Sequence, residues 1–127
     1  LVFVDPPYWS MKDDDYPDDS ISSLSRSEFY ESIQKLAKNA SEILRKDGIF
    51  ALIIQNQTEK DLEEGEEQIP HILNVYDRVN ELDEFELVRQ ISCPQSSQTF
   101  LPQQVEEAKK ESRMLGLVRD LLIWRKK

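Results

Sequence analysis

The 127-residue sequence predicts one α/β domain, a sheet with helices on both faces. Two observations lead to this prediction. Apolar runs of strand length alternate along the chain with stretches whose apolar residues recur every three to four positions. One run, residues 49–54, is apolar throughout, which is typical of a strand buried on both faces of a parallel sheet. The expected order is β-α-β-α-β-α-β, without an internal repeat or an interdomain linker.

The first expected strand covers residues 1–4 and stops before two consecutive prolines, which cannot continue a β-ladder. Residues 12–23 contain many Asp and Ser residues and are expected to form an exposed loop.

A capping box predicts where the first helix begins. Ser25 and Glu28 have the required spacing, and apolar residues from Phe29 to Ile43 then follow at helical intervals. We expect the helix to end at Gly48, which would take the left-handed cap conformation.

The second half of the chain continues the alternation. Residues 69–82 have a helical apolar stripe, and residues 85–93 alternate in the way of a strand. Residues 102–114 are rich in Gln, Glu, Lys and Ala and predict an exposed helix, and 118–124 form the last strand. The stripe in the second helix consists of Ile69, Ile72, Leu73, Tyr76, Val79 and Leu82.

Composition excludes several classes of site. The chain has three scattered glycines, so it has no glycine-rich loop for a phosphate or a nucleoside. One Cys and one His exclude a disulfide framework and a Cys/His zinc site, and we expect no metal. The net charge of −9 is carried by residues 12–19 and 59–67, both expected loops, so it argues only weakly against nucleic-acid binding.

The candidate catalytic residues are Asp5-Pro6-Pro7-Tyr8, followed by Trp9, at the carboxyl end of the first strand. Ligands of open α/β sheets bind at that end of the strands. The carboxylate of Asp5 can accept hydrogen bonds, and the prolines stiffen the backbone so that carbonyls point in fixed directions. Tyr8 offers a flat face on which a base can stack.

These groups suit an exocyclic amino group on a flat heterocycle. The amine can donate to Asp5 and to the carbonyl of Pro6, which draws its lone pair out of conjugation with the ring. The nitrogen can then attack a methyl sulfonium in line. Such a geometry requires the base to leave the duplex stack.

At these residues the sequence resembles a family. Residues 4–9, Val-Asp-Pro-Pro-Tyr-Trp, look like the catalytic motif of the S-adenosylmethionine-dependent DNA amino-methyltransferases, the N6-adenine and N4-cytosine class. Residues 43–54 and 117–126 are similar to later segments of the same catalytic domain. The resemblance implies a Rossmann-like methyltransferase half-sheet of about four strands. Its last strand, 118–124, should lie antiparallel between 49–54 and 85–93.

The resemblance also implies roles for the motif residues. Asp5, Pro6 and Tyr8 would be catalytic, with Asp5 also contacting the cofactor. Pro7 and Trp9 would contact the substrate, although Trp9 is better suited to packing than to stacking on a base. Adenine N6 is favoured over cytosine N4, because cytosine enzymes of the family more often have Ser in place of Asp5.

One departure from the family concerns the cofactor. The family binds S-adenosylmethionine mainly on the other half of its sheet, and neither that segment nor a target-recognition region is found here. We therefore expect residues 1–127 to be a partial catalytic domain. Its partners would be DNA and a cofactor-binding half, supplied by a missing N-terminal segment or by another chain. We expect a cytoplasmic location, and we expect no membrane partner.

Two other functions stay open: methylation of a purine amino group in RNA, and a catalytically inactive partner subunit that binds nucleic acid.

Weaker candidates have structural interpretations that we favour. Residues 13–19 could bind a cation but suit a solvated loop better. His71 is expected at the surface or a boundary, and Asn56 and Gln57 could line the site. Polar residues of the helix 102–114, namely Gln103, Gln104, Lys109, Lys110 and Arg113, could contact phosphate.

Overall fold

The structure is a computed structural model that describes residues 1–7, 9, 18–58, 62–94, 101–112 and 118–127. The elements in order are β1 (Val2–Val4), η2 (Ile21–Ser23), α1 (Arg26–Ile43), β2 (Ile49–Ile54), α2 (His71–Asn80), β3 (Phe85–Pro94), α3 (Pro102–Lys110) and β4 (Val118–Lys126). Apart from the short η2, this is the expected alternation of strands and helices.

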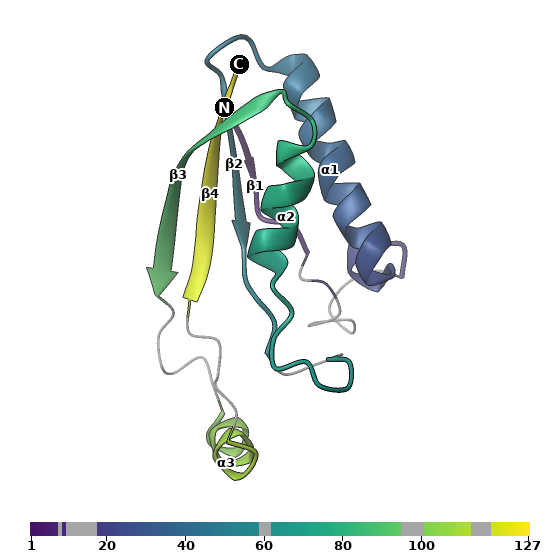
Figure 1. Cartoon of the computed structure of the whole chain (residues 1–127), viewed down its shortest axis with the longest axis vertical. Helices are drawn as coiled ribbons and strands as arrows, with labels where there is room; N and C mark the ends of the chain where they lie inside the picture. The colour runs from purple at the N-terminus through teal and green to yellow at the C-terminus, as the bar shows by residue number, and fades with distance from the viewer. Residues whose placement is uncertain (8, 10–17, 59–61, 95–100, 113–117) are drawn as a thin grey trace.

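The four strands form one sheet in the order β1-β2-β4-β3 (Figure 1). β1 is parallel to β2, with Val4 opposite Leu52. β4 is antiparallel to both of its neighbours, β2 and β3. The last strand therefore lies where the resemblance placed it, and the expected α/β half-sheet is confirmed.

We expected helices on both faces of the sheet, and the arrangement of the described helices differs from this expectation. Among the described residues, α1 and α2 pack together and cover the same face of the sheet (Figure 1). The core of that face joins Ile33 and Val75 of these helices to Phe50, Leu122 and Trp124 of the sheet. α3 lies beyond the ends of β3 and β4 and not over the sheet.

The second face of the sheet is also apolar. Phe3, Ala51 and Ile123 are neighbours across three strands on this face. Phe3 is 55% exposed, and Ile123 is half-buried. This explains the unbroken apolar run of β2: its side chains are apolar on both faces, although no described helix covers the second.

The start of α1 was predicted correctly, and its end was not. Ser25 and Glu28 form the capping box. The helix ends at Ile43, which is 76% exposed, and Asp47 adopts the left-handed conformation with φ 64°. Gly48 is needed for a different reason: the backbone of Arg45 approaches it closely, and a Cβ there would lie 2.7 Å from the carbonyl oxygen of Arg45.

Two further details of the second half could not be seen in the sequence pattern. In α2, Leu73 is 63% exposed, and Val75 takes the buried position. In β3, an irregularity between Leu87 and Arg89 shifts the register, so these two residues point to opposite faces. None of the described helices is long and apolar enough to cross a membrane.

Candidate active site

The residues Asp5-Pro6-Pro7, which we call the proline turn, follow β1 directly, at the carboxyl end of the two parallel strands. Asp5 is exposed and makes no hydrogen bond or ion pair with another described residue. Pro6 is buried and Pro7 is half-buried. Tyr8 lies outside the described residues. The turn therefore presents a solvent-accessible carboxylate on a stretch of backbone whose φ angles are fixed by two prolines.

Trp9 is half-buried at the edge of the core. Its indole Nε1 donates a hydrogen bond of 2.6 Å to the carbonyl oxygen of Leu24. The guanidinium of Arg26 lies 5.7 Å from the centre of the ring system. Trp9 is thus packed against the start of α1.

Asn56 and Gln57 follow β2 at the same end of the sheet. The side-chain oxygen of Asn56 accepts a hydrogen bond of 2.9 Å from the backbone N–H of Ile72, so it caps the first turn of α2. Gln57 is buried and its backbone pairs with that of Ile69 in both directions. Their contacts in the structure stabilise the start of α2.

Asp120 was not among the residues singled out in the sequence. It is buried near the start of β4, opposite Ile54, and its carboxylate accepts a hydrogen bond from the side chain of Gln90. Because β4 runs antiparallel, its first residues lie at the edge where β2 ends. The sequence offered one sign of this position, namely an acidic residue near the start of the last predicted strand.

His71 is buried, with 3% of its surface exposed, so the expectation of a surface or boundary position was wrong. Its Nε2 lies 3.2 Å from the amide oxygen of Gln57, and its Nδ1 lies 2.7 Å from the hydroxyl of Tyr30. Since an amide oxygen only accepts, Nε2 donates and Nδ1 accepts from Tyr30. Asn74 in turn donates to the Tyr30 oxygen at 2.9 Å.

The electrostatic properties of this network follow from its burial. Burial and, to a lesser extent, the positive charge of Arg26 lower the pKa of His71 from 6.5 to about 4. Burial also raises the pKa of Tyr30 above its usual value. Both side chains are therefore neutral near pH 7, which fits the hydrogen-bond directions.

Glu66 lies in a segment that we expected to be a solvated loop, and it forms an ion pair with Arg26 of α1. Its carboxylate binds Arg26 through two hydrogen bonds of 2.8 and 3.0 Å. These hydrogen bonds lower the pKa of Glu66 and raise that of Arg26. The loop before α2 is thereby tied to the start of α1.

The remaining candidates gain no support from the structure. Residues 13–17 lie outside the described residues, as does Arg113, while Asp18 and Asp19 are exposed. No cluster of metal ligands occurs among the residues that the structure describes. On α3, Lys109 and Lys110 are exposed, as expected for a solvated helix face, and Lys109 pairs with Glu106.

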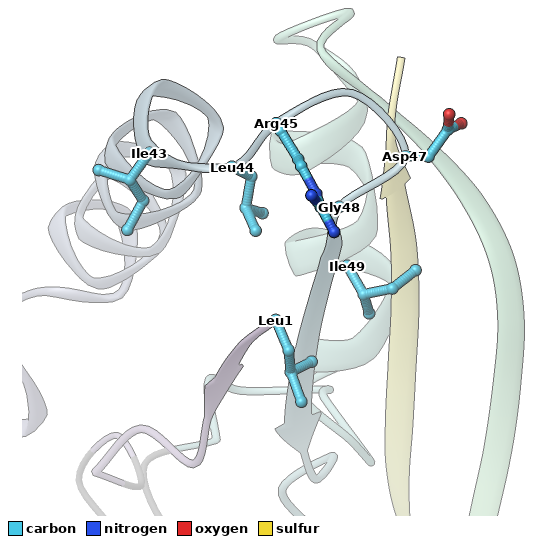
Figure 2. Close-up of a pocket in the computed structure, with 7 residues that line it drawn as sticks. All are labelled: Leu1, Ile43, Leu44, Arg45, Asp47, Gly48 and Ile49. Carbon is cyan, nitrogen blue, oxygen red and sulfur yellow. The ribbon is translucent and has the colours of Figure 1, made fainter.

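An open hollow of about 460 Å³ lies at the opposite end of the sheet (Figure 2). It is lined by Leu1, by the chain from Ile43 to Arg45, and by the chain from Asp47 to Ile49. These residues surround the amino ends of β1 and β2, whereas Asp5 follows the carboxyl end of β1. We therefore place the candidate site at the proline turn and not at this hollow.

Comparisons with known proteins identify the fold. No protein-family model and no curated protein sequence matches the chain. Among solved structures, the chain is similar to the cytosine-N4-specific PvuII DNA methyltransferase, with 17% identity and a TM-score of 0.69. It is also similar to a protein from Thermus thermophilus assigned as a DNA modification methylase, with 14% identity and a TM-score of 0.64. That protein has also been solved with S-adenosyl-L-methionine.

The similarity covers 98–99% of this chain but only 42–46% of the matched structures. The chain thus spans less than half the length of these proteins. At such low identity the likeness shows the fold, a half-sheet shared with DNA methyltransferases.

Proposed function

We propose that this chain forms the catalytic half of a methyltransferase that methylates an exocyclic amino group of a base in DNA. One observation carries the proposal. The sequence Asp5-Pro6-Pro7 follows the carboxyl end of β1, in a four-stranded sheet whose fold is similar to that of a DNA methyltransferase. The motif contains the groups that would bind the amine, and the fold is similar to that of a DNA methyltransferase.

In this proposal the chain binds and orients the target amine. The exposed carboxylate of Asp5 accepts one hydrogen bond from the amine, and the carbonyl of Pro6 accepts the other. Pro7 fixes the turn, and Tyr8 stacks on the flipped base. Localising the nitrogen lone pair by two fixed acceptors makes the amine a better nucleophile. The nitrogen would gain the methyl group as the carbon–sulfur bond of the sulfonium breaks and a neutral thioether leaves, and it would lose one proton to water or to Asp5.

The residues present fit only part of S-adenosylmethionine. When bound, this cofactor supplies a methyl group on a positively charged sulfur. The exposed carboxylate of Asp5 is suited to such a positive charge. The sequence has three scattered glycines and no glycine-rich loop for the nucleoside. The proposal therefore assigns the rest of the cofactor site to a second half of the enzyme, and the greater length of the matched structures leaves room for such a half.

We favour adenine N6 as the acceptor, since cytosine enzymes of this class more often have Ser in place of Asp5. The cytosine-N4 specificity of PvuII methyltransferase makes cytosine the competing acceptor within the same chemistry.

The test is methyl transfer by the full-length protein from labelled S-adenosylmethionine to duplex DNA and to RNA. We expect label in DNA. Label in RNA alone would replace the DNA substrate with RNA, and specific DNA binding without transfer would favour an inactive subunit.

Asp5→Ala tests the role of the carboxylate, with Asp77→Asn as the matched control. Asp77 is an exposed acidic residue on α2. We expect Asp5→Ala to abolish transfer with folding intact, and Asp77→Asn to transfer at the wild-type rate. Full activity of Asp5→Ala would refute the role given to Asp5.

A further inference from the structure

Three groups surround the side chain of Trp9, one residue beyond the proposed catalytic tetrapeptide. The indole N–H is bonded to the carbonyl of Leu24 at 2.6 Å. The guanidinium of Arg26 lies over the ring, 5.7 Å from its centre. The imidazole of His71 meets the ring edge-to-face, with 5.9 Å between ring centres and 66° between planes. We call these three groups the Trp9 clamp.

Each member of the Trp9 clamp is itself held in place. Leu24 precedes the capping box that begins α1. Arg26 is fixed by its two hydrogen bonds to Glu66, from the segment between β2 and α2. Because a planar guanidinium bound at two points cannot easily rotate, its position over the indole is restricted.

His71 is held by hydrogen bonds on both ring nitrogens. Asn74 donates to the Tyr30 oxygen, Tyr30 donates to Nδ1, and Nε2 donates to Gln57. The chain of donors uses both ring nitrogens of a neutral imidazole, so the ring has one preferred orientation. The Trp9 clamp therefore links α1, α2 and the segments after β1 and β2.

We propose that Trp9 is a positioning residue that fixes the downstream end of the catalytic turn and does not stack on the substrate base. The upstream end is fixed by β1, where Val4 pairs with Leu52. Between these anchors, Pro6 and Pro7 remove most of the backbone freedom. Asp5 and the carbonyl of Pro6 are then held in the arrangement that methyl transfer needs. This inference rests on the proposed function and deepens it.

Trp9→Phe separates the two roles in the full-length protein. Phe keeps an aromatic face but has no N–H to donate to Leu24. For a positioning residue, we expect the single-turnover methyl-transfer rate to fall about 10- to 100-fold while the Kd for DNA changes less than about twofold. For a base-stacking residue, Phe would transfer at nearly the wild-type rate, and Trp9→Ala would weaken DNA binding about tenfold or more. That second pattern would overturn the proposal.

Arg26→Gln tests the clamp without altering the tryptophan. Its matched control is Lys38→Gln, which removes another ion pair of α1, that of Lys38 with Glu84. We expect a reduced transfer rate for Arg26→Gln and the wild-type rate for Lys38→Gln. Because Arg26 acts through the ring of Trp9, adding Arg26→Gln to Trp9→Ala should lower the rate no further. Fully multiplicative effects of the two substitutions would contradict the clamp.

A structural measurement keeps this inference separate from the proposed function. By NMR, the indole hydrogen of Trp9 should exchange with solvent at least about tenfold faster in Arg26→Gln than in wild type or Lys38→Gln. If the wild type shows no methyl transfer, the proposed function fails, and this exchange experiment still decides whether the clamp exists. Equal exchange in all three proteins would refute the clamp.

Discussion

Mild acid should destabilise this chain through His71. The sequence contains one His, and in the folded chain its imidazole is buried and hydrogen-bonded as a neutral group. Its pKa falls from 6.5 to about 4 on folding. The unfolded chain therefore binds a proton at a higher pH than the folded chain does. Stability is fully present above pH 6.5 and is lost as the pH falls from there towards 4.

The size of the effect follows from the pKa difference. Linkage gives a loss of about 1.3 kcal/mol in the free energy of unfolding between about pH 7.5 and 5.5, and about 3 kcal/mol by pH 4. The interval between about pH 7.5 and 5.5 isolates the contribution of His71, because the lowered pKa values of Glu28, Glu66 and Glu84 affect stability only at lower pH.

The assay is urea unfolding of the 127-residue chain at several pH values between about 5.5 and 7.5, followed by circular dichroism. His71→Gln is the control, since it lacks the titrating ring. We expect it to be less stable throughout and nearly independent of pH in this interval. A wild-type stability that does not change with pH, or a slope that persists in His71→Gln, would refute the argument.

Three further predictions concern packing and cofactor binding. Gly48→Ala should lower stability by about 1–3 kcal/mol, measured by urea unfolding, because the new Cβ would lie 2.7 Å from a backbone oxygen; an unchanged midpoint would contradict this. Trp124→Phe should cost less than about 1.5 kcal/mol, against about 3–5 for Trp124→Ala, because the buried indole N–H has no partner among the described residues. Equal costs would show that the N–H is satisfied. Residues 1–127 alone should bind S-adenosylmethionine weakly or not at all, and micromolar binding by calorimetry would place the cofactor site within them.

The sequence predicted the features of the fold that local signals encode. The capping box of Ser25 and Glu28 requires only neighbours within one helical turn, and it was identified correctly. The position of β4 between β2 and β3 is not local, and only the resemblance to a family supplied it. The motif at the end of β1 was also visible, because prolines mark the end of a strand.

The parts that were missed depend on contacts between distant residues. Tyr30 and His71 are 41 positions apart, and Arg26 and Glu66 are 40 apart, so no spacing pattern connects them. A polar residue within an apolar stripe is buried only if the fold brings it a partner. For the same reason, the left-handed residue before β2 could not be assigned to Asp47 when the adjacent Gly48 was the usual choice.

The central claim is that the turn after β1 holds the amino group of a DNA base during methyl transfer. Mass spectrometry of nucleosides from DNA incubated with S-adenosylmethionine tests it most directly, with the full-length wild type and Asp5→Asn side by side. We predict N6-methyladenine with the wild type, and at least about 100-fold less with Asp5→Asn, since the acceptor charge is lost. DNA without any amino-methylated base, or equal methylation by the two proteins, would contradict the account.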